Sequence, residues 1–157
     1  MRSDERPRTG FTLVELLLVV VLIAVVTAMT VPRFKRTAEE FRLKAAAFDI
    51  YKLIQFAKEN ALVQHRDHRV RFVFSDGTYQ LLRVSDEGVF RPFQGRFGKN
   101  KNLPEGISFR SDADKLTCYP DGRCDIFSLT LRNSSTGRYE ISVENLGSAV
   151  RVREMAA

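Results

Sequence analysis

An almost wholly apolar run, over residues 11–31, is the feature that most constrains the fold of this chain. Its only polar residues are Thr12, Glu15, Thr27 and Thr30. A helix rises about 1.5 Å per residue, so the run would extend roughly 31 Å, close to the hydrocarbon thickness of a bilayer. A core helix of a soluble domain would keep a polar stripe, which this run lacks. The sequence therefore predicts a membrane-spanning helix over residues 11–32.

The ten residues before the run are polar and basic. They contain Arg2, Arg6 and Arg8 and end at Gly10. Basic residues favour the cytoplasmic side of a membrane, so the N-terminus is expected there and the rest of the chain outside. An ordinary secretory signal has a shorter apolar core, with the small-residue cleavage site after it. Such cleavage, near the small residues late in the run, is the less favoured alternative, because here the small residue lies before the run.

Pro32 closes the apolar run. A proline within a helix removes a hydrogen bond and clashes with the preceding turn, so the helix is predicted to end or kink there. Over residues 38–64, apolar side chains recur at spacings of three and four, which predicts an amphipathic helix. The expected apolar face comprises Leu43, Ala47, Ile50, Ile54, Ala57 and Ala61. This face needs a partner, which the remaining residues must supply.

The remaining residues predict short antiparallel strands. Val70, Phe72 and Phe74 alternate before an Asp-Gly turn at 76–77, and residues 78–84 return, which indicates a hairpin. Further strands are expected near 89–93, 107–110, 116–119, 125–132, 138–144 and 149–153. The predicted fold is α+β: a long N-terminal α-helix whose amphipathic half packs on antiparallel β-sheets, within a globular head over residues 33–157.

The sequence Gly-Phe-Thr-Leu-Val-Glu-Leu at 10–16 resembles the type IV prepilin signature. The resemblance lies in Gly10, Phe11 and a glutamate, Glu15, at the fifth position of the apolar helix. A carboxylate inside a membrane costs several kcal/mol unless it is paired, so such residues are usually functional. Glu15 could instead reach the membrane interface. That alternative explains one tolerated charge but not the glycine, the phenylalanine and the basic leader together.

The resemblance implies that a prepilin peptidase removes residues 1–10, cutting between Gly10 and Phe11, and methylates the new amine of Phe11. It implies a single-pass protein of the bacterial inner membrane with a periplasmic head, which an inner-membrane assembly platform then transfers to a filament. In the filament, Glu15 would face the N-terminal amine of a neighbouring pilin or pseudopilin. The two charges attract strongly in a core of low dielectric constant.

The head resembles the GspH/FimT family of minor pseudopilins and minor pilins. The resemblance rests on a helix followed by the 70–84 hairpin, on Tyr-Pro-Asp-Gly at 119–122 and on Thr-Gly-Arg at 136–138. It implies a minor pseudopilin of a type II secretion system, near the pseudopilus tip, that helps to export folded proteins. The alternative is a minor pilin of a type IV pilus that primes assembly or takes up DNA. No catalytic constellation supports a third hypothesis, a membrane-anchored enzyme, and no cofactor is expected.

Cys118 and Cys124 form an even, closely spaced pair in a head expected outside the cytoplasm. Such a pair predicts one disulfide, across the turn at 120–122. The spacing does not suit a zinc knuckle, and two further ligands are missing. His65 and His68 could share a helix face and bind a metal, but a solvated helix end is favoured. No metal site is therefore expected.

The net charge of +6 favours a solvated surface over a nucleic-acid site, because the basic residues are scattered among acidic ones. Arg151 and Arg153 form a closely spaced basic pair. They alternate with valines, so both are expected on one side of a terminal strand. A solvent-facing edge strand is the favoured interpretation. Contact with the phosphates of DNA is the alternative.

Overall fold

The computed structural model describes residues 11–144 and 149–155, and for residues 29–36 it describes the backbone only. The chain forms two compact units, which divide between Thr37 and Ala38. Within the described residues the elements are α1 (Leu13–Gln64), β1 (His68–Val73), β2 (Thr78–Val84), β3 (Phe90–Pro92), β4 (Lys101–Asn102), β5 (Ile107–Ser111), β6 (Lys115–Cys118), β7 (Phe127–Asn133), β8 (Arg138–Val143) and β9 (Val150–Met155).

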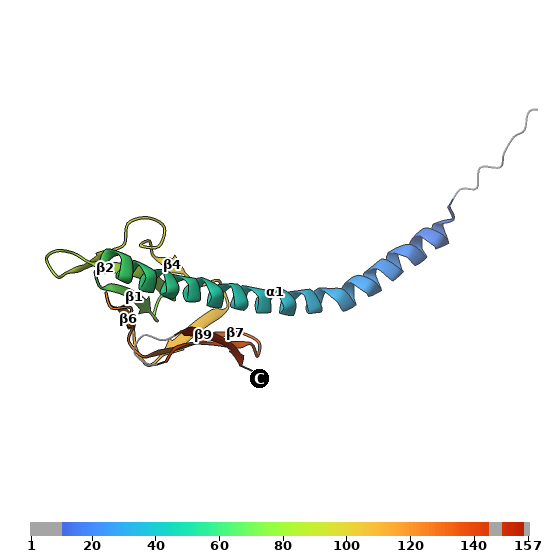
Figure 1. Ribbon diagram of the computed structural model, residues 1–157. Helices are drawn as coiled ribbons and strands as arrows, with labels where there is room; N and C mark the ends of the chain where they lie inside the picture. Colours follow the sequence, from blue (N-terminus) through green and yellow to red (C-terminus); the bar gives the residue numbers. More distant parts are fainter. Residues whose placement is uncertain (1–10, 145–148, 156–157) are drawn as a thin grey trace, which may run out of the picture. The chain divides into compact units, whose positions relative to one another are not determined.

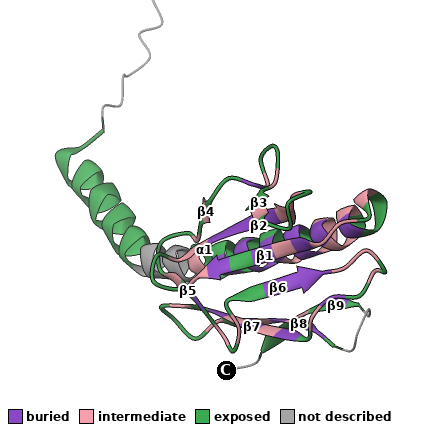
Figure 2. Cartoon of the chain, turned by 90° about the vertical axis from the view of Figure 1, so that its left-hand side faces the viewer, coloured by how far each residue is buried: buried purple, intermediate pink, exposed green. Residues whose placement is uncertain are grey.

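The first unit contains the N-terminal part of α1. Every side chain described there between residues 11 and 28 is exposed (Figure 2). The helix does not end at Pro32, because the helical backbone continues through that position. The side chain of Pro32 lies outside the described residues, so a kink there stays a prediction. Among the described residues, no helix has an apolar stretch long enough to cross a membrane.

The second unit, called the head below, combines the C-terminal part of α1 with two antiparallel sheets (Figure 1). The first sheet has the order β3-β2-β1-β6, with β4 also paired to β2. The second sheet has the order β5-β7-β8-β9. The prediction of an α+β fold with a long helix on antiparallel sheets is confirmed.

The predicted hairpin is present as β1 and β2. Its register pairs His68 with Arg83 and Val73 with Thr78. Gly77 in the connecting turn has a φ of 62°, which glycine adopts at little cost. The sequence predicts one strand between residues 85 and 104, near 89–93, and β3 lies there, paired with the preceding strand β2. The structure adds a second short strand, β4, which was not predicted because it depends on pairing with residues of β2 much earlier in the chain.

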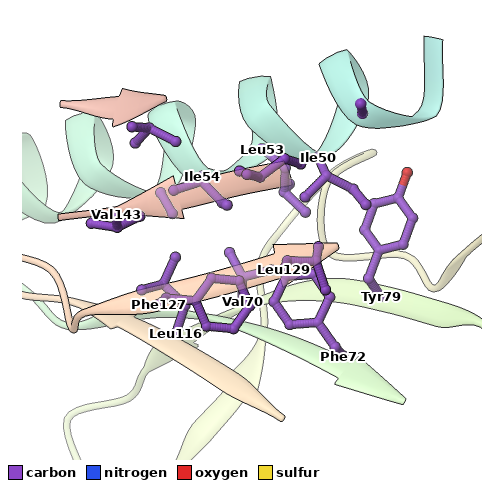
Figure 3. Close-up of a cluster of buried hydrophobic side chains, with 14 of the residues drawn as sticks. Ile50, Leu53, Ile54, Val70, Phe72, Tyr79, Leu116, Phe127, Leu129 and Val143 are labelled. Carbon is purple, nitrogen blue, oxygen red and sulfur yellow. The ribbon is translucent and has the colours of Figure 1, made fainter. Parts of the chain in front are cut away.

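The core lies between α1 and the two sheets (Figure 3). All six residues of the predicted helix face are buried, together with Ala46 and Leu53. The rings of Phe72 in β1 and Phe127 in β7 stack with their centroids 5.2 Å apart, which joins the two sheets. Burying a Leu, Ile or Phe side chain contributes about 1.5–3 kcal/mol. The helix face is therefore the main contact that holds both sheets.

His65 lies directly after the last residue of α1 and terminates the helix. This residue has a positive φ of 49°, and the N–H of Arg66 donates to the carbonyl of Ala61 at 3.3 Å. A left-handed residue with this hydrogen bond is the usual way to terminate a helix. The side chain of His65 is exposed, as expected for a solvated helix end.

His68 differs from the expectation, and a solvated helix end is wrong for this residue. His68 opens β1 and is fully buried on the same face as Val70 and Phe72. Its Nδ1 lies 2.9 Å from the carbonyl oxygen of Arg66, and its Nε2 has no partner within the described residues. Burial lowers the pKa of His68 below the ordinary 6.5, and the charge of Arg83 acts in the same direction. The alternation of Val70 and Phe72, extended back by two residues, would have predicted this position.

Acidification should lower the free energy of unfolding of the head through His68. In the unfolded chain this histidine binds a proton near pH 6.5, whereas in the folded head buried His68 resists protonation. The free energy of unfolding is therefore not reduced by His68 above pH 6.5. It should fall as the pH decreases from 6.5 towards the lowered pKa of the folded state. Urea unfolding of the full-length protein in detergent, followed by tyrosine fluorescence between about pH 7.5 and about pH 5, measures this loss.

Two variants isolate His68 from the carboxylates that also titrate in this range. His68→Gln keeps a donor for the Arg66 carbonyl and should make stability less dependent on pH. His65→Asn, in the left-handed position that asparagine tolerates, should leave the pH dependence unchanged. An unchanged slope in His68→Gln would show that this histidine is not responsible.

Candidate assembly interface

The start of α1 places Glu15 by a defined hydrogen bond. The hydroxyl of Thr12 accepts from the N–H of Glu15 at 3.2 Å, and the carbonyl of Thr12 accepts from the N–H of Leu16 at 3.2 Å. Thr12 is thus the N-cap, and Glu15 is the third residue of the helix, as in a capping box. The positive end of the helix dipole also favours a carboxylate in this turn. Glu15 therefore has a local structural reason for its position.

The carboxylate of Glu15 is exposed and faces no ion-pair partner within the described residues. The side chains of Thr12 and Thr27, in the described part of the run, form local hydrogen bonds. The hydroxyl of Thr27 donates to the carbonyl of Ile23 at 2.7 Å, so this threonine tolerates an apolar environment. Glu15 is therefore the polar side chain of the described run that is left for a partner outside the helix.

Apolar side chains surround this carboxylate and are open on all sides of the helix. Leu13 is 81% exposed and Leu16 is 62% exposed. Phe11, predicted as the first residue after cleavage, is 79% exposed. Gly10, predicted on the other side of the cleaved bond, lies outside the described residues. Contiguous exposed apolar side chains of this kind mark a surface that contacts a membrane or another protein.

The structure joins Cys118 and Cys124 by a disulfide, and both residues are buried. The turn that they enclose is closed by two backbone hydrogen bonds, from Tyr119 to Arg123 at 2.8 Å and from Gly122 to Tyr119 at 3.0 Å. Gly122 has a φ of 82°, and an added Cβ would lie 3.1 Å from the Leu62 side chain of α1. The turn thus packs closely on the end of the helix.

Asp125 accepts hydrogen bonds from two residues beside this disulfide. Its carboxylate accepts from the N–H of Thr117 and from the hydroxyl of Tyr119, each at 2.9 Å. The hydrogen bond to Asp125 raises the pKa of Tyr119. On the second sheet, Tyr139 donates to Glu154 at 2.9 Å, and its pKa is raised by desolvation and then by this bond. Both tyrosines therefore stay neutral donors within the head.

Removing the disulfide should lower the stability of the head by a limited amount. The loop is short, so replacing both cysteines with alanine should cost no more than the ~3 kcal/mol expected for a fifteen-residue loop. In wild-type protein taken from the periplasm, unfolded without reduction, thiol titration should find no reactive thiol. Two reactive thiols would contradict the disulfide.

Arg151 and Arg153 lie on β9, an edge strand of the second sheet, and both are exposed. Arg151 Nη1 lies 2.9 Å from Glu144 Oε2. Arg153 lies opposite Glu140 in the register of β8 and β9. The expectation that the two arginines share one face of a terminal strand agrees with this register. Contact with DNA stays a prediction.

Three further arginines lie on the same face and were missed in the sequence. Arg110, Arg132 and Arg138 come from β5, β7 and β8. Only the register between strands brings them beside β9, and that register involves residues far apart in the chain. Within the residues that the structure describes, no three His, Cys, Asp or Glu side chains converge to hold a metal ion.

Comparison with known proteins yields one sequence match and several structural ones. Residues 6–31 match the prokaryotic N-terminal methylation motif. No curated protein has a significant sequence match to the chain. The motif therefore covers the predicted leader end, the cleavage site and the apolar run, but not the head.

The head is similar to solved minor pseudopilins and a minor pilin. The minor pseudopilin EpsH from the Vibrio cholerae type 2 secretion system is 17% identical, with 73% of this chain and 97% of that chain covered and a TM-score of 0.64. Escherichia coli GspH is 13% identical, with 73% and 89% covered and a TM-score of 0.58. The type IV minor pilin FimU from Pseudomonas aeruginosa is 14% identical, with 76% and 92% covered and a TM-score of 0.56. The chain thus has a pilin-like fold of the kind found in minor pseudopilins.

Proposed function

We propose that this chain is a minor pseudopilin of a type II protein secretion system. In this role it is a structural subunit, without catalysis, near the tip of the periplasmic pseudopilus that helps to export folded proteins. The proposal rests on one combination. An N-terminal methylation motif at residues 6–31 precedes a head whose structural alignment with EpsH covers 97% of the EpsH chain.

In this proposal the chain acts in two environments in turn. Residues 1–10 are a leader that stays in the cytoplasm, residues 11–32 cross the inner membrane, and residues 33–157 form the periplasmic head. The exposed apolar side chains of residues 11–28 support this arrangement, since water would oppose their exposure. Prepilin peptidase would then cut after Gly10 and methylate the amine of Phe11, and an assembly platform would move the helix into the filament.

Glu15 fixes the axial position of the subunit when the helix enters the filament. The Thr12 hydroxyl accepts from the backbone N–H of Glu15, which fixes this residue in the first turn, and its carboxylate is left to pair with the N-terminal ammonium of a neighbouring subunit. Within an apolar filament core, leaving that ammonium unpaired would cost several kcal/mol. The pair therefore favours one axial position of the new subunit over others, where either charge would be buried alone.

Replacing Glu15 with leucine should separate assembly from membrane anchoring. Glu15→Leu lengthens the apolar run, so the protein should be cleaved after Gly10 and remain in the membrane. It should nevertheless fail to copurify with its filament partners, because the carboxylate that pairs with a neighbouring amine is lost. Membrane fractionation, mass spectrometry of the N-terminus and copurification measure these three properties.

Glu15→Gln is the matched control for shape. It keeps the size of the side chain and removes the charge, so it should show the same assembly defect. Normal assembly of both variants would show that the charge does not position subunits. Normal assembly of Glu15→Gln alone would assign the role to side-chain shape or to a neutral hydrogen bond.

Loss of the protein should reduce secretion and leave pili intact. Deleting its gene should retain type II substrates in the periplasm, as measured by immunoblots of periplasm and medium. The alternative function, as a minor pilin of a type IV pilus, is supported by the similarity to FimU at a TM-score of 0.56. Loss of surface pili with normal secretion would establish that alternative. Expression of the wild-type gene in trans is the control for both readouts.

A further inference from the structure

The outward face of the second sheet carries a concentration of arginines that the proposed function leaves unused. Along β7 and β8, alternate residues such as Leu129 and Ile141 point into the core, so the residues between them point outward. The exposed arginines on this outward side, called the arginine face below, are Arg110, Arg132, Arg138, Arg151 and Arg153.

The strand register arranges this face in rows across the sheet. One row runs Arg110, Thr130, Glu140, Arg153. A second runs Ser108, Arg132, Arg138, Met155, and a third runs Ser128, Ser142, Arg151. Serine and threonine side chains lie among the arginines, and Glu140 is the acidic side chain within these rows. The result is a flat, strongly basic surface with hydrogen-bonding groups between its charges.

Within the part of the head that the structure describes, no ion pair joins Arg110, Arg132, Arg138 or Arg153 to an acidic side chain. Among the described residues, the ion pair on this face joins Arg151 to Glu144. Arg132 and Arg138 lie directly opposite each other on β7 and β8. Like charges in such a pair destabilise a sheet, so the head does not gain stability from this arrangement. Carboxylates supplied from outside would relieve the repulsion.

We propose that the arginine face docks an acidic surface of another protein. Guanidinium groups bind carboxylates through two parallel hydrogen bonds, and the neighbouring hydroxyls can donate to the same oxygens. A surface hollow of about 430 Å³ at the β5 side is lined by Arg110, Ser111, Asp112, Ser128 and Thr130, so one guanidinium and three hydroxyls face it together with one carboxylate. This hollow can receive a carboxylate side chain. The inference concerns the head alone and does not rest on assembly into a filament.

The composition of the face favours a protein over a nucleic acid. Glu140 lies in the middle row, where a continuous line of phosphates would meet its carboxylate. A protein surface can place a hydroxyl or a basic group opposite Glu140 and carboxylates around it. The rows contain no aromatic side chain on which bases could stack. Four strands at about 4.8 Å spacing make the face only about 14 Å wide, which fits a weak, salt-sensitive contact.

A charge-matched pair of double variants tests the proposal in the full-length protein in detergent. Arg110→Thr/Arg153→Thr removes two charges from the arginine face and keeps side chains that suit a strand. Arg71→Thr/Arg91→Thr removes two charges from exposed positions on the first sheet. The probes are a fluorescent peptide of alternating glutamate and serine, and a duplex DNA of similar length, in anisotropy titrations at low salt.

The wild-type protein should bind the acidic peptide more tightly than the DNA, and added salt should weaken that binding. The Arg110/Arg153 variant should bind the peptide on the order of tenfold more weakly, or about 1.4 kcal/mol, while the Arg71/Arg91 variant should stay close to wild type. Equal weakening in both variants, or no binding of the peptide, would overturn the proposal. Tighter binding of DNA that is lost in the Arg110/Arg153 variant would assign the face to nucleic acid instead. Circular dichroism confirms that each variant is folded.

Discussion

The burial of one face of α1 against two sheets is the contact on which the rest of the head depends. Neither sheet has a second covering layer among the described elements, so each buries its apolar side chains against the helix and against the other sheet. Small residues such as Ala47, Ala57 and Ala61 are fully buried in this helix face. Shortening this face would therefore expose both sheets at once. The remaining features, including the disulfide turn on Leu62, add detail to a core that the helix already organises.

The same helix has a second kind of surface before residue 29. In the head, α1 has one apolar face, and charged residues such as Lys52 and Glu59 are exposed. Between residues 13 and 26, the exposed side chains are apolar on every side except at Glu15. The amphipathic part of the helix is stabilised by packing its one apolar face on the sheets of the head. A helix of the second kind needs an apolar solvent or several neighbouring helices, and this need is the physical basis of the proposed transfer from membrane to filament.

Local patterns were enough to predict the elements, but not the contacts between them. The helix face from Leu43 to Ala61 and the hairpin at 70–84 follow from spacing and turn residues, and the structure confirms both. Two features depend on pairing between distant strands and were missed. These are the short strand β4 beside β2, and the placement of Arg110 and Arg153 on one face. His68 was misassigned because two histidines three residues apart fit a helix, whereas α1 ends at Gln64 and the strand period already applies at His68.

The N-cap at Thr12 also determines what a peptidase would encounter. Helical backbone is a poor substrate for proteolysis, because its carbonyls and N–H groups are turned inward and already bonded. Here the helix begins at Leu13, and Phe11 and Thr12 precede it in non-helical backbone. The N–H groups of Glu15 and Leu16 bond to Thr12 and not to residues further upstream. A capped start at this position leaves the Phe11 side of the proposed scissile bond outside the helix, so the hydroxyl of Thr12 would also limit where a peptidase could cut.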